Sequence, residues 1–326
     1  MPSTLARIAA LFAAVGCGAI AQAQHQKMPR IGFLSAAPPA AIAPRVEAFR
    51  YGLKELGYIE GKNIAVEYRW GDGTNVLLSR LAAELAHLKV DVIVTAGPAA
   101  TRSAKEATST TPIIMAFDPD PVGLGFVASL ARPGGNVTGL SALYPEVTGK
   151  QMELLKEIIP KLSRVAILAD PTVPGNTQAL RDVERAAALF RVRLQLIDMR
   201  DAKGFEAIFE AATKEGADAV LVLPSALATS QRPRIASLAA KHRIPTMYFS
   251  PEFVDHGGLI TYSTSLTELS RRAATYVDKI LKGAKPAALP VEQATKFELA
   301  INLKAARQIG LTIPPSVLAR ADKVIE

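Results

Sequence analysis

Two aspartates that each precede a proline lie in the stretch FDPDPVGLGF at 117–126. Asp118 directly follows an apolar run, and Pro119 favours an extended backbone for it, so its carboxylate can face a cleft and receive an ammonium or hydroxyl group. An Asx-turn that only shapes the loop is an equally good interpretation of Asp118. Asp120 is better explained as a helix N-cap, because Pro121 suits the first helical position.

A turn that can bind a carboxylate, whereas Asp118 can bind an ammonium group, lies in TAGPAA at 95–100. Gly97 can cap a helix that starts at Pro98, which directs the N–H groups from Ala99 onward out of the positive end of the helix dipole. Such a helix end binds carboxylates, and the Thr95 hydroxyl can add a hydrogen bond. The alternative for any single turn of this kind is an ordinary strand-to-helix connection, which is the more frequent case.

Other polar and aromatic residues also follow apolar runs. Ligands of open parallel sheets bind beyond the carboxyl ends of the strands, so these positions are candidates for ligand contacts. Aromatic side chains there suit a ring or aliphatic ligand, with ordinary core packing as the alternative for each one. The further candidates are Ser35, Ala36, Tyr144, Asp170, Asn176, Ser225, Tyr248, Ser250, Glu252 and Tyr262.

The signatures of catalysis, metal binding and nucleotide binding are weak. The histidines share no ligand spacing, and no G-x-S-x-G nucleophile motif occurs. GLGFVA at 123–128 does not directly follow a strand, and TGK at 148–150 lacks the serine or threonine of a P-loop. We therefore expect no catalytic residue, no metal site and no cofactor. An α/β enzyme that uses Asp118 and Asp170 is the less favoured alternative.

Short apolar runs alternate with helical patterns along the chain. Val46, Phe49 and Leu53 illustrate the helical spacing, and Gly57 stands where that helix ends. Strand–helix alternation predicts parallel sheets with right-handed crossovers. The predicted strands are RIGFL 30–34, NIAVEYRW 63–70, DVIVT 91–95, PIIMAF 112–117, NVTGL 136–140, RVAILA 164–169, RLQLID 193–198, AVLVL 219–223, PTMYF 245–249 and LITYS 259–263.

The pattern restarts near residue 164, which favours two doubly wound, Rossmann-like lobes of the α/β class over one wide sheet. Gly-, Pro- and Thr-rich stretches supply three hinge crossings between the lobes. We expect residues 28–140 with about 264–285 in lobe 1, and 141–263 with about 286–326 in lobe 2.

The first residues are typical of an export signal. An apolar stretch follows Arg7, and the small residues Ala21 and Ala23 suit a cleavage site, so residues 1–23 are predicted to be a signal peptide and the mature protein to be periplasmic. Cys17, the only cysteine, lies within it, and lipid anchoring through Cys17 is a minority alternative. The formal charge of +8 is scattered without aromatic-rich basic clusters, so no nucleic-acid partner is expected.

Several segments together resemble the substrate-binding proteins of ABC-type importers, in the branch that includes tryptophan and tyrosine transport components. They are RIGFLSAAP, the DPVG…PGGNVTG region and INLKAARQIGLTIP, within a resemblance that covers about residues 28–326. The resemblance implies a type I periplasmic-binding-protein fold, one small-molecule ligand in the cleft, and a membrane permease with its cytoplasmic ATPase as partners. It does not specify the ligand.

The favoured function is therefore capture of a small molecule, an amino acid or other carboxylate, aromatic ones included, for delivery to an ABC importer. Closure by hinge motion around the ligand is expected, as is a monomer. An exported sensing module that presents the ligand to a receptor is the alternative that the sequence does not separate.

Overall fold

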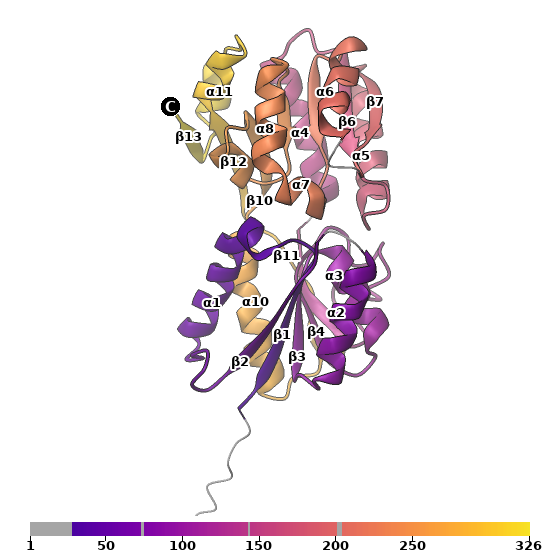
Figure 1. The fold of residues 1–326 in the computed structure, drawn as a ribbon, viewed down its shortest axis with the longest axis vertical. Helices are drawn as coiled ribbons and strands as arrows, with labels where there is room; N and C mark the ends of the chain where they lie inside the picture. The colour runs from indigo at the N-terminus through magenta and orange to yellow at the C-terminus, as the bar shows by residue number, and fades with distance from the viewer. Residues whose placement is uncertain (1–27, 73–74, 143, 201–203) are drawn as a thin grey trace, which may run out of the picture.

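The computed structural model describes residues 28–326 except 73–74, 143 and 201–203, and it consists of two α/β lobes joined at a narrow waist (Figure 1). The predicted signal peptide at 1–23, with Cys17 and Ala23, lies outside the described residues. Among the helices described, none is both long enough and apolar enough to cross a membrane.

Lobe 1 is built on a six-stranded parallel sheet in the order β11-β5-β4-β3-β1-β2. Buried Val and Ile dominate its central strands, as expected for a sheet covered on both faces. The strands are β1 (Arg30–Ser35), β2 (Ala65–Trp70), β3 (Val92–Ala96), β4 (Ile113–Asp118), β5 (Val137–Ser141) and β11 (Glu292–Gln293).

Helices cover both faces of the lobe 1 sheet (Figure 1). The helix α10 comes from the C-terminal part of the chain, yet its buried stripe, which includes Leu269, Ala273 and Val277, packs in the lobe 1 core. Its apolar residues recur every three or four positions, so one stripe of the helix faces the sheet. The helices are η1 (Pro39–Ile42), α1 (Ala43–Glu55), α2 (Asn75–His87), α3 (Pro98–Ala107), α10 (Leu266–Leu281) and η3 (Pro286–Ala288).

Lobe 2 contains a seven-stranded sheet in the order β13-β12-β10-β9-β8-β6-β7. Its strands from β6 to β10 are parallel as predicted, but β12 runs antiparallel to β10, so the sheet is mixed at one edge. The strands are β6 (Arg164–Ala169), β7 (Arg193–Asp198), β8 (Ala219–Val222), β9 (Thr246–Tyr248), β10 (Ile260–Thr264), β12 (Phe297–Asn302) and β13 (Lys323–Ile325).

Two clusters of buried apolar side chains lie on the two faces of the lobe 2 sheet. One joins α4, α5 and the C-terminal helices to the sheet, and the other joins α6, α8 and α9 to it. The helices are α4 (Tyr144–Ile158), α5 (Asn176–Phe190), α6 (Phe205–Lys214), α7 (Ala226–Ser230), α8 (Arg232–Lys241), α9 (Glu252–Asp255), α11 (Leu303–Gln308) and α12 (Pro315–Leu318).

The chain passes between the lobes after β5, after β10 and after β11. The crossings lie side by side, because the Thr264 hydroxyl donates to the carbonyl of Ala142 at 2.6 Å and the N–H of Ala294 donates to the carbonyl of Ser141 at 2.9 Å. The third crossing differs from the expected one near 286. Residues 286–293 stay with lobe 1 because β11 pairs with β5, so the crossing lies between Gln293 and Phe297.

One close helix contact in lobe 1 depends on a glycine. A Cβ built on Gly52 of α1 would lie 2.4 Å from the carbonyl oxygen of Arg271 in α10. We expect Gly52→Ala to lower the free energy of unfolding by about 1–3 kcal/mol, because the backbone atom cannot move aside without displacing α10. Urea unfolding measures the change.

Gly149→Ala in α4 is the matched control, since a Cβ there meets no heavy atom within 4 Å. That substitution should raise the free energy of unfolding by about 0.5–1 kcal/mol through the higher helix propensity of alanine. Equal effects of the two substitutions would contradict the role of Gly52 in the contact between α1 and α10.

Candidate functional site

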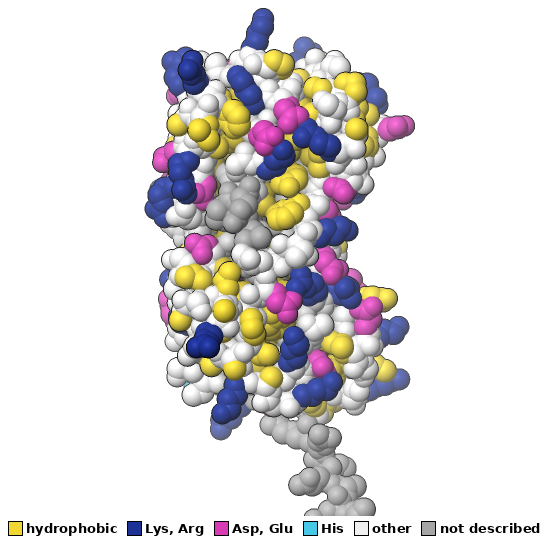
Figure 2. Space-filling view, turned by 180° about the vertical axis from the view of Figure 1, so that it is seen from behind, with side chains coloured by type: hydrophobic (Ala, Val, Ile, Leu, Met, Phe, Trp, Pro, Cys, Tyr) yellow, Lys and Arg dark blue, Asp and Glu magenta, His cyan; other side chains and the backbone are white. Residues whose placement is uncertain are grey.

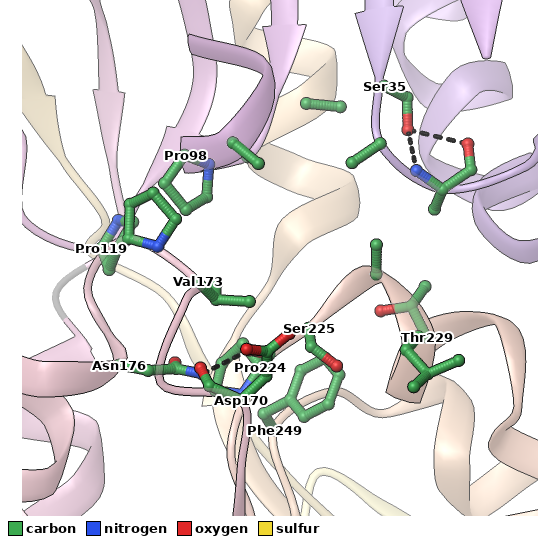
Figure 3. A pocket seen from close by; sticks show the side chains of 18 of the residues that line it. Ser35, Pro98, Pro119, Asp170, Val173, Asn176, Pro224, Ser225, Thr229 and Phe249 are labelled. Carbon is green, nitrogen blue, oxygen red and sulfur yellow. Dashed lines mark hydrogen bonds between the residues drawn. The ribbon is translucent and has the colours of Figure 1, made fainter. Parts of the chain in front are cut away.

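A cavity of about 240 Å³ lies between the lobes, where the carboxyl ends of the parallel strands meet (Figure 3). Both lobes contribute to its walls, as predicted for an interlobe ligand site. Of the predicted ligand contacts, the ones that line the cavity are Ser35, Ala36, Gly97, Ala99, Asp170, Asn176 and Ser225.

The lobe 1 wall is formed by the ends of β1, β3 and β4. Ser35 holds the turn after β1, because its hydroxyl donates to the carbonyl of Ala37 and accepts from the N–H of Ala37, both at 3.0 Å. Gly97 has a φ of 98°, a left-handed conformation that glycine adopts without strain, and it places the first turn of α3 on the cavity. Among the described residues no side chain caps that turn, so its N–H groups from Ala99 onward can donate to a ligand.

The lobe 2 wall is formed by the loops after β6 and β8. Asn176 joins these loops, since its Nδ2 donates to the carbonyls of Asp170 at 2.9 Å and Pro224 at 3.0 Å. Asp170 Oδ1 accepts from the N–H of Thr172 at 2.9 Å, and its carboxylate lies beside the cavity. Ser225 caps α7 by accepting from the N–H of Ala228 at 2.9 Å.

Asp118 does not line the cavity. It is fully buried, and its Oδ2 accepts from the Thr101 hydroxyl at 2.7 Å, while the hydroxyls of Thr101 and Thr95 lie 2.8 Å apart. This chain of hydrogen bonds ties α3 to the ends of β3 and β4. Asp118 and Thr95 therefore support the wall from behind, and the geometry offers no direct contact between either residue and a ligand.

Asp120 lies outside the cavity as well. Its Oδ1 accepts from the N–H of Gly123 at 2.9 Å, the capping geometry expected from the sequence. The predicted helix from Pro121 is wrong, because residues 121–125 form turns instead. A left-handed Gly125, with a φ of 70°, ends the turn before a second helical turn forms.

Several predicted contacts lie in the second lobe away from the cavity wall. Tyr248 is buried and stacks on Phe253 with ring centroids 4.5 Å apart, and Ser250, two positions later, is also buried. Tyr262 stacks on Phe297 with ring centroids 6.0 Å apart. Core packing explains both tyrosines. The side chain of Tyr144 lies outside the described residues.

Glu252 is engaged with the opposite lobe instead of the cavity. Its Oε1 accepts from Nε of Arg45 in α1 at 2.9 Å. Arg45 itself lines the cavity and lies over the ring of Phe117, with 5.6 Å between its Cζ and the ring centroid. The sequence prediction missed Arg45, because a single arginine in an amphipathic helix carries no signal of its own.

The apolar part of the cavity was also incompletely predicted. Phe117 and Phe249 are the last residues of two predicted strands, which was the available signal, and both line the cavity. The cavity is also lined by proline and aliphatic side chains from loops and helix ends, and their residue types alone do not distinguish them from similar residues elsewhere in the chain. These further lining residues include Ile42, Pro98, Pro119, Val173, Pro174, Pro224, Ala226, Leu227 and Leu266.

The part of the chain that the structure describes contains no group of three or more His, Cys, Asp or Glu side chains that could hold a metal ion. On the face shown in Figure 2, basic and acidic side chains are intermingled over both lobes.

The buried carboxyl of Asp118 leads to a pH-dependent prediction. Burial raises its pKa well above the ordinary value of 3.8, against the opposing effects of the Thr101 hydrogen bond and the Arg102 charge. Above pH 3.8 the folded protein therefore retains a proton that the unfolded chain has lost. This contribution to stability is complete below that pH and is lost as the pH rises through the raised pKa.

Asp118→Asn removes this titration with little change in shape. From about pH 4 upward, the free energy of unfolding of the wild type should fall relative to that of Asp118→Asn, by at most about 1.4 kcal/mol per pH unit. Urea unfolding of both proteins between pH 4 and 7 measures the difference. Parallel pH profiles would show that Asp118 is already charged in the folded protein.

Comparisons with known proteins agree with this architecture. Residues 39–325 match the family described as ABC transporter substrate binding protein. A tyrosine-binding protein of Clostridioides difficile is 24% identical over 278 residues, which cover 85% of this chain and 79% of that protein.

Two solved structures are similar over most of the chain. A conserved domain protein from Vibrio cholerae matches with a TM-score of 0.86 and 27% identity, covering 91% of this chain and all (100%) of that one. An ABC domain from Streptococcus pneumonia in complex with L-Trp matches with a TM-score of 0.85 and 25% identity, covering 91% of this chain and 99% of that one. The predicted type I periplasmic-binding-protein fold is confirmed, and the chain belongs to the family of ABC transporter substrate-binding proteins.

Proposed function

We propose that this protein is exported to the periplasm, captures an amino acid or a related carboxylate with an aromatic side chain, and delivers it to an ABC importer. The observation that carries the proposal is the interlobe cavity, whose walls come from both lobes. A ligand held between two hinged lobes can be sequestered by closure and released by opening. The partners in this proposal are a membrane permease and its ATPase, met by a monomeric carrier.

The lining of the cavity supports the ligand class. Phe117 and Phe249 present rings, and Val173 adds an aliphatic surface, which together suit an aromatic or aliphatic side chain. Of the similar proteins, the one from Clostridioides difficile is described as a tyrosine-binding protein, and the structure from Streptococcus pneumonia is a complex with L-Trp. The family and the cavity are thus consistent with an aromatic amino acid as the cargo.

The charged ends of an amino acid have complementary groups in the same cavity. The carboxylate of Asp170 lies beside the cavity and suits an ammonium group. The first turn of α3 suits a carboxylate because its N–H groups, which begin at Ala99, have no side-chain partner among the described residues. These two features lie in opposite lobes, so an amino acid placed between them favours the closed arrangement.

A thermal-shift screen of the chain from Gln24 to Glu326 tests the ligand class. L-tryptophan, L-tyrosine, other amino acids, sugars and nucleosides are compared, with tryptamine as the analogue of tryptophan that lacks the carboxylate. A ligand present at about a thousand times its Kd should add about 4 kcal/mol to the free energy of unfolding. We expect L-tryptophan or L-tyrosine to raise Tm and tryptamine to raise it much less. A response to sugars or nucleosides alone would contradict the proposal.

A substitution that fills the cavity tests whether the ligand binds there. Val173 lies between the two walls in Figure 3, and Val173→Trp introduces a ring where the ligand would lie. We expect the Kd for the ligand found in the screen to rise by at least about 100-fold, because a filled cavity removes the apolar burial that drives binding. Isothermal titration calorimetry measures it.

Leu189→Trp is the matched control for this variant, because Leu189 of α5 is 82% exposed and lies outside the cavity. The Kd of Leu189→Trp for the same ligand should equal that of the wild type. Unchanged affinity in Val173→Trp would place the binding site elsewhere.

A further inference from the structure

Three charged residues meet where the two lobes touch beside the cavity. Arg45 lies in the first turn of α1 in lobe 1, and Arg232 and Glu252 begin α8 and α9 in lobe 2. Arg45 and Arg232 are each 4% exposed, so neither side chain is solvated as an arginine ordinarily is. We name Arg45, Arg232 and Glu252 the interlobe cluster.

Both arginines of the interlobe cluster bind across the boundary between the lobes. Arg45 donates through Nε to Glu252 Oε1 at 2.9 Å, and Arg232 donates through Nη2 to the backbone carbonyl of Ala41, which lies in η1. The two contacts run in opposite directions, one donor from each lobe. A rotation that separates the lobes must break both.

The two guanidinium groups also pack against aromatic rings near the boundary between the lobes. Arg45 lies over the ring of Phe117 on the cavity wall, and Arg232 lies over the ring of Phe253 in lobe 2, with 5.8 Å between its Cζ and the ring centroid. Cation–π contacts of this kind fix the orientation of a guanidinium. These contacts therefore hold Arg45 in position to donate to the carboxylate of Glu252, and Arg232 in position to donate to the carbonyl of Ala41.

Glu252 is the only carboxylate in the interlobe cluster, and it compensates both guanidiniums. Burial acts to raise its pKa, but the charges of Arg45 and Arg232 and the hydrogen bond from Arg45 outweigh burial and hold the pKa at about 2. Burial lowers the pKa of Arg232 to about 10, with the nearby charge of Arg45 acting in the same direction and Glu252 opposing it. The cluster thus carries a net positive charge even with Glu252 ionised.

We propose that the interlobe cluster is a clasp that stabilises the closed arrangement of the lobes, with Glu252 as the residue on which closure depends. In the open protein the lobes separate and water solvates each charge. In the closed protein the arginines lose that water, and in exchange Arg45 donates to Glu252 and Arg232 donates to the carbonyl of Ala41. The clasp acts on the lobes themselves, so it operates in the ligand-free protein and goes beyond the identity of the ligand.

The expected effect of removing Glu252 follows from this arrangement. Glu252→Gln leaves two neighbouring guanidiniums buried without a counter-charge in the closed state, which is strongly unfavourable. The open state is little affected, because water screens both charges there. The equilibrium must therefore shift toward the open arrangement.

Single-molecule FRET on the ligand-free protein tests the clasp. The only cysteine of the chain lies in the predicted signal peptide, so exposed positions in the two lobes, Lys54→Cys and Lys214→Cys, take the dyes specifically. Ligand carried through purification is removed by unfolding, dialysis and refolding. We expect Glu252→Gln to lower the ratio of closed to open molecules by about tenfold.

Two further variants complete the experiment. Glu157→Gln makes the same change in an ion pair with Arg320 that lies within lobe 2, and it should leave the ratio unchanged. Arg232→Gln removes the contact with Ala41 but keeps the pair of Arg45 and Glu252, so it should lower the ratio less than Glu252→Gln does. It also provides a second test if Glu252→Gln fails to fold.

Equal closed populations in the wild type and both cluster variants, including a wild type that is wholly open, would overturn the proposal. Because no ligand is present, this outcome is separate from the ligand screen. A protein that binds none of the tested amino acids can still show the clasp, and a protein that binds tryptophan can still lack it.

Discussion

The carboxyl ends of the parallel strands in the two sheets face each other across the waist of the molecule, and the other functional features depend on this constraint. The side chains of the central strands are buried in the cores of the lobes and are therefore not available to a ligand. The segments at the strand ends are not enclosed in this way, and in each lobe they reach the same cavity. A cavity made in this way belongs to neither lobe alone, so its volume and its contacts change whenever the lobes move.

The path of the chain makes such movement possible. It crosses the waist at three adjacent places, and hydrogen bonds such as that from Thr264 to Ala142 join the crossings to each other. Helix α10 belongs to the core of lobe 1 although the strand before it lies in lobe 2. Each lobe therefore has its own core, and in the proposed opening the groups whose surroundings change would be those at the boundary.

Contacts between buried polar groups stabilise the cavity in two places. Asp118, Thr101 and Thr95 form a hydrogen-bonded chain behind the lobe 1 wall, which fixes the turn that presents Gly97 and Ala99. Arg45 and Glu252 form a charged contact in front of it, between the lobes. The first is satisfied within one lobe and positions the wall. The second requires both lobes, so a separation of the lobes would break it.

The sequence by itself determined the α/β class and the two lobes, and it predicted the strand ends, where the cavity lies, because apolar runs and turn residues are local signals. Of the ligand contacts that it predicted within a few positions after strands, Ser35, Gly97, Asp170, Asn176 and Ser225 line the cavity. It did not predict the antiparallel β12, whose partner is distant in sequence, or the position of the third crossing. Only the tertiary structure decided that Phe117 faces the cavity while the next residue, Asp118, is buried, and that Arg45 meets Glu252, 207 positions away. The physical reason is that neither burial nor an ion pair across the waist exists until segments far apart in the chain have packed together.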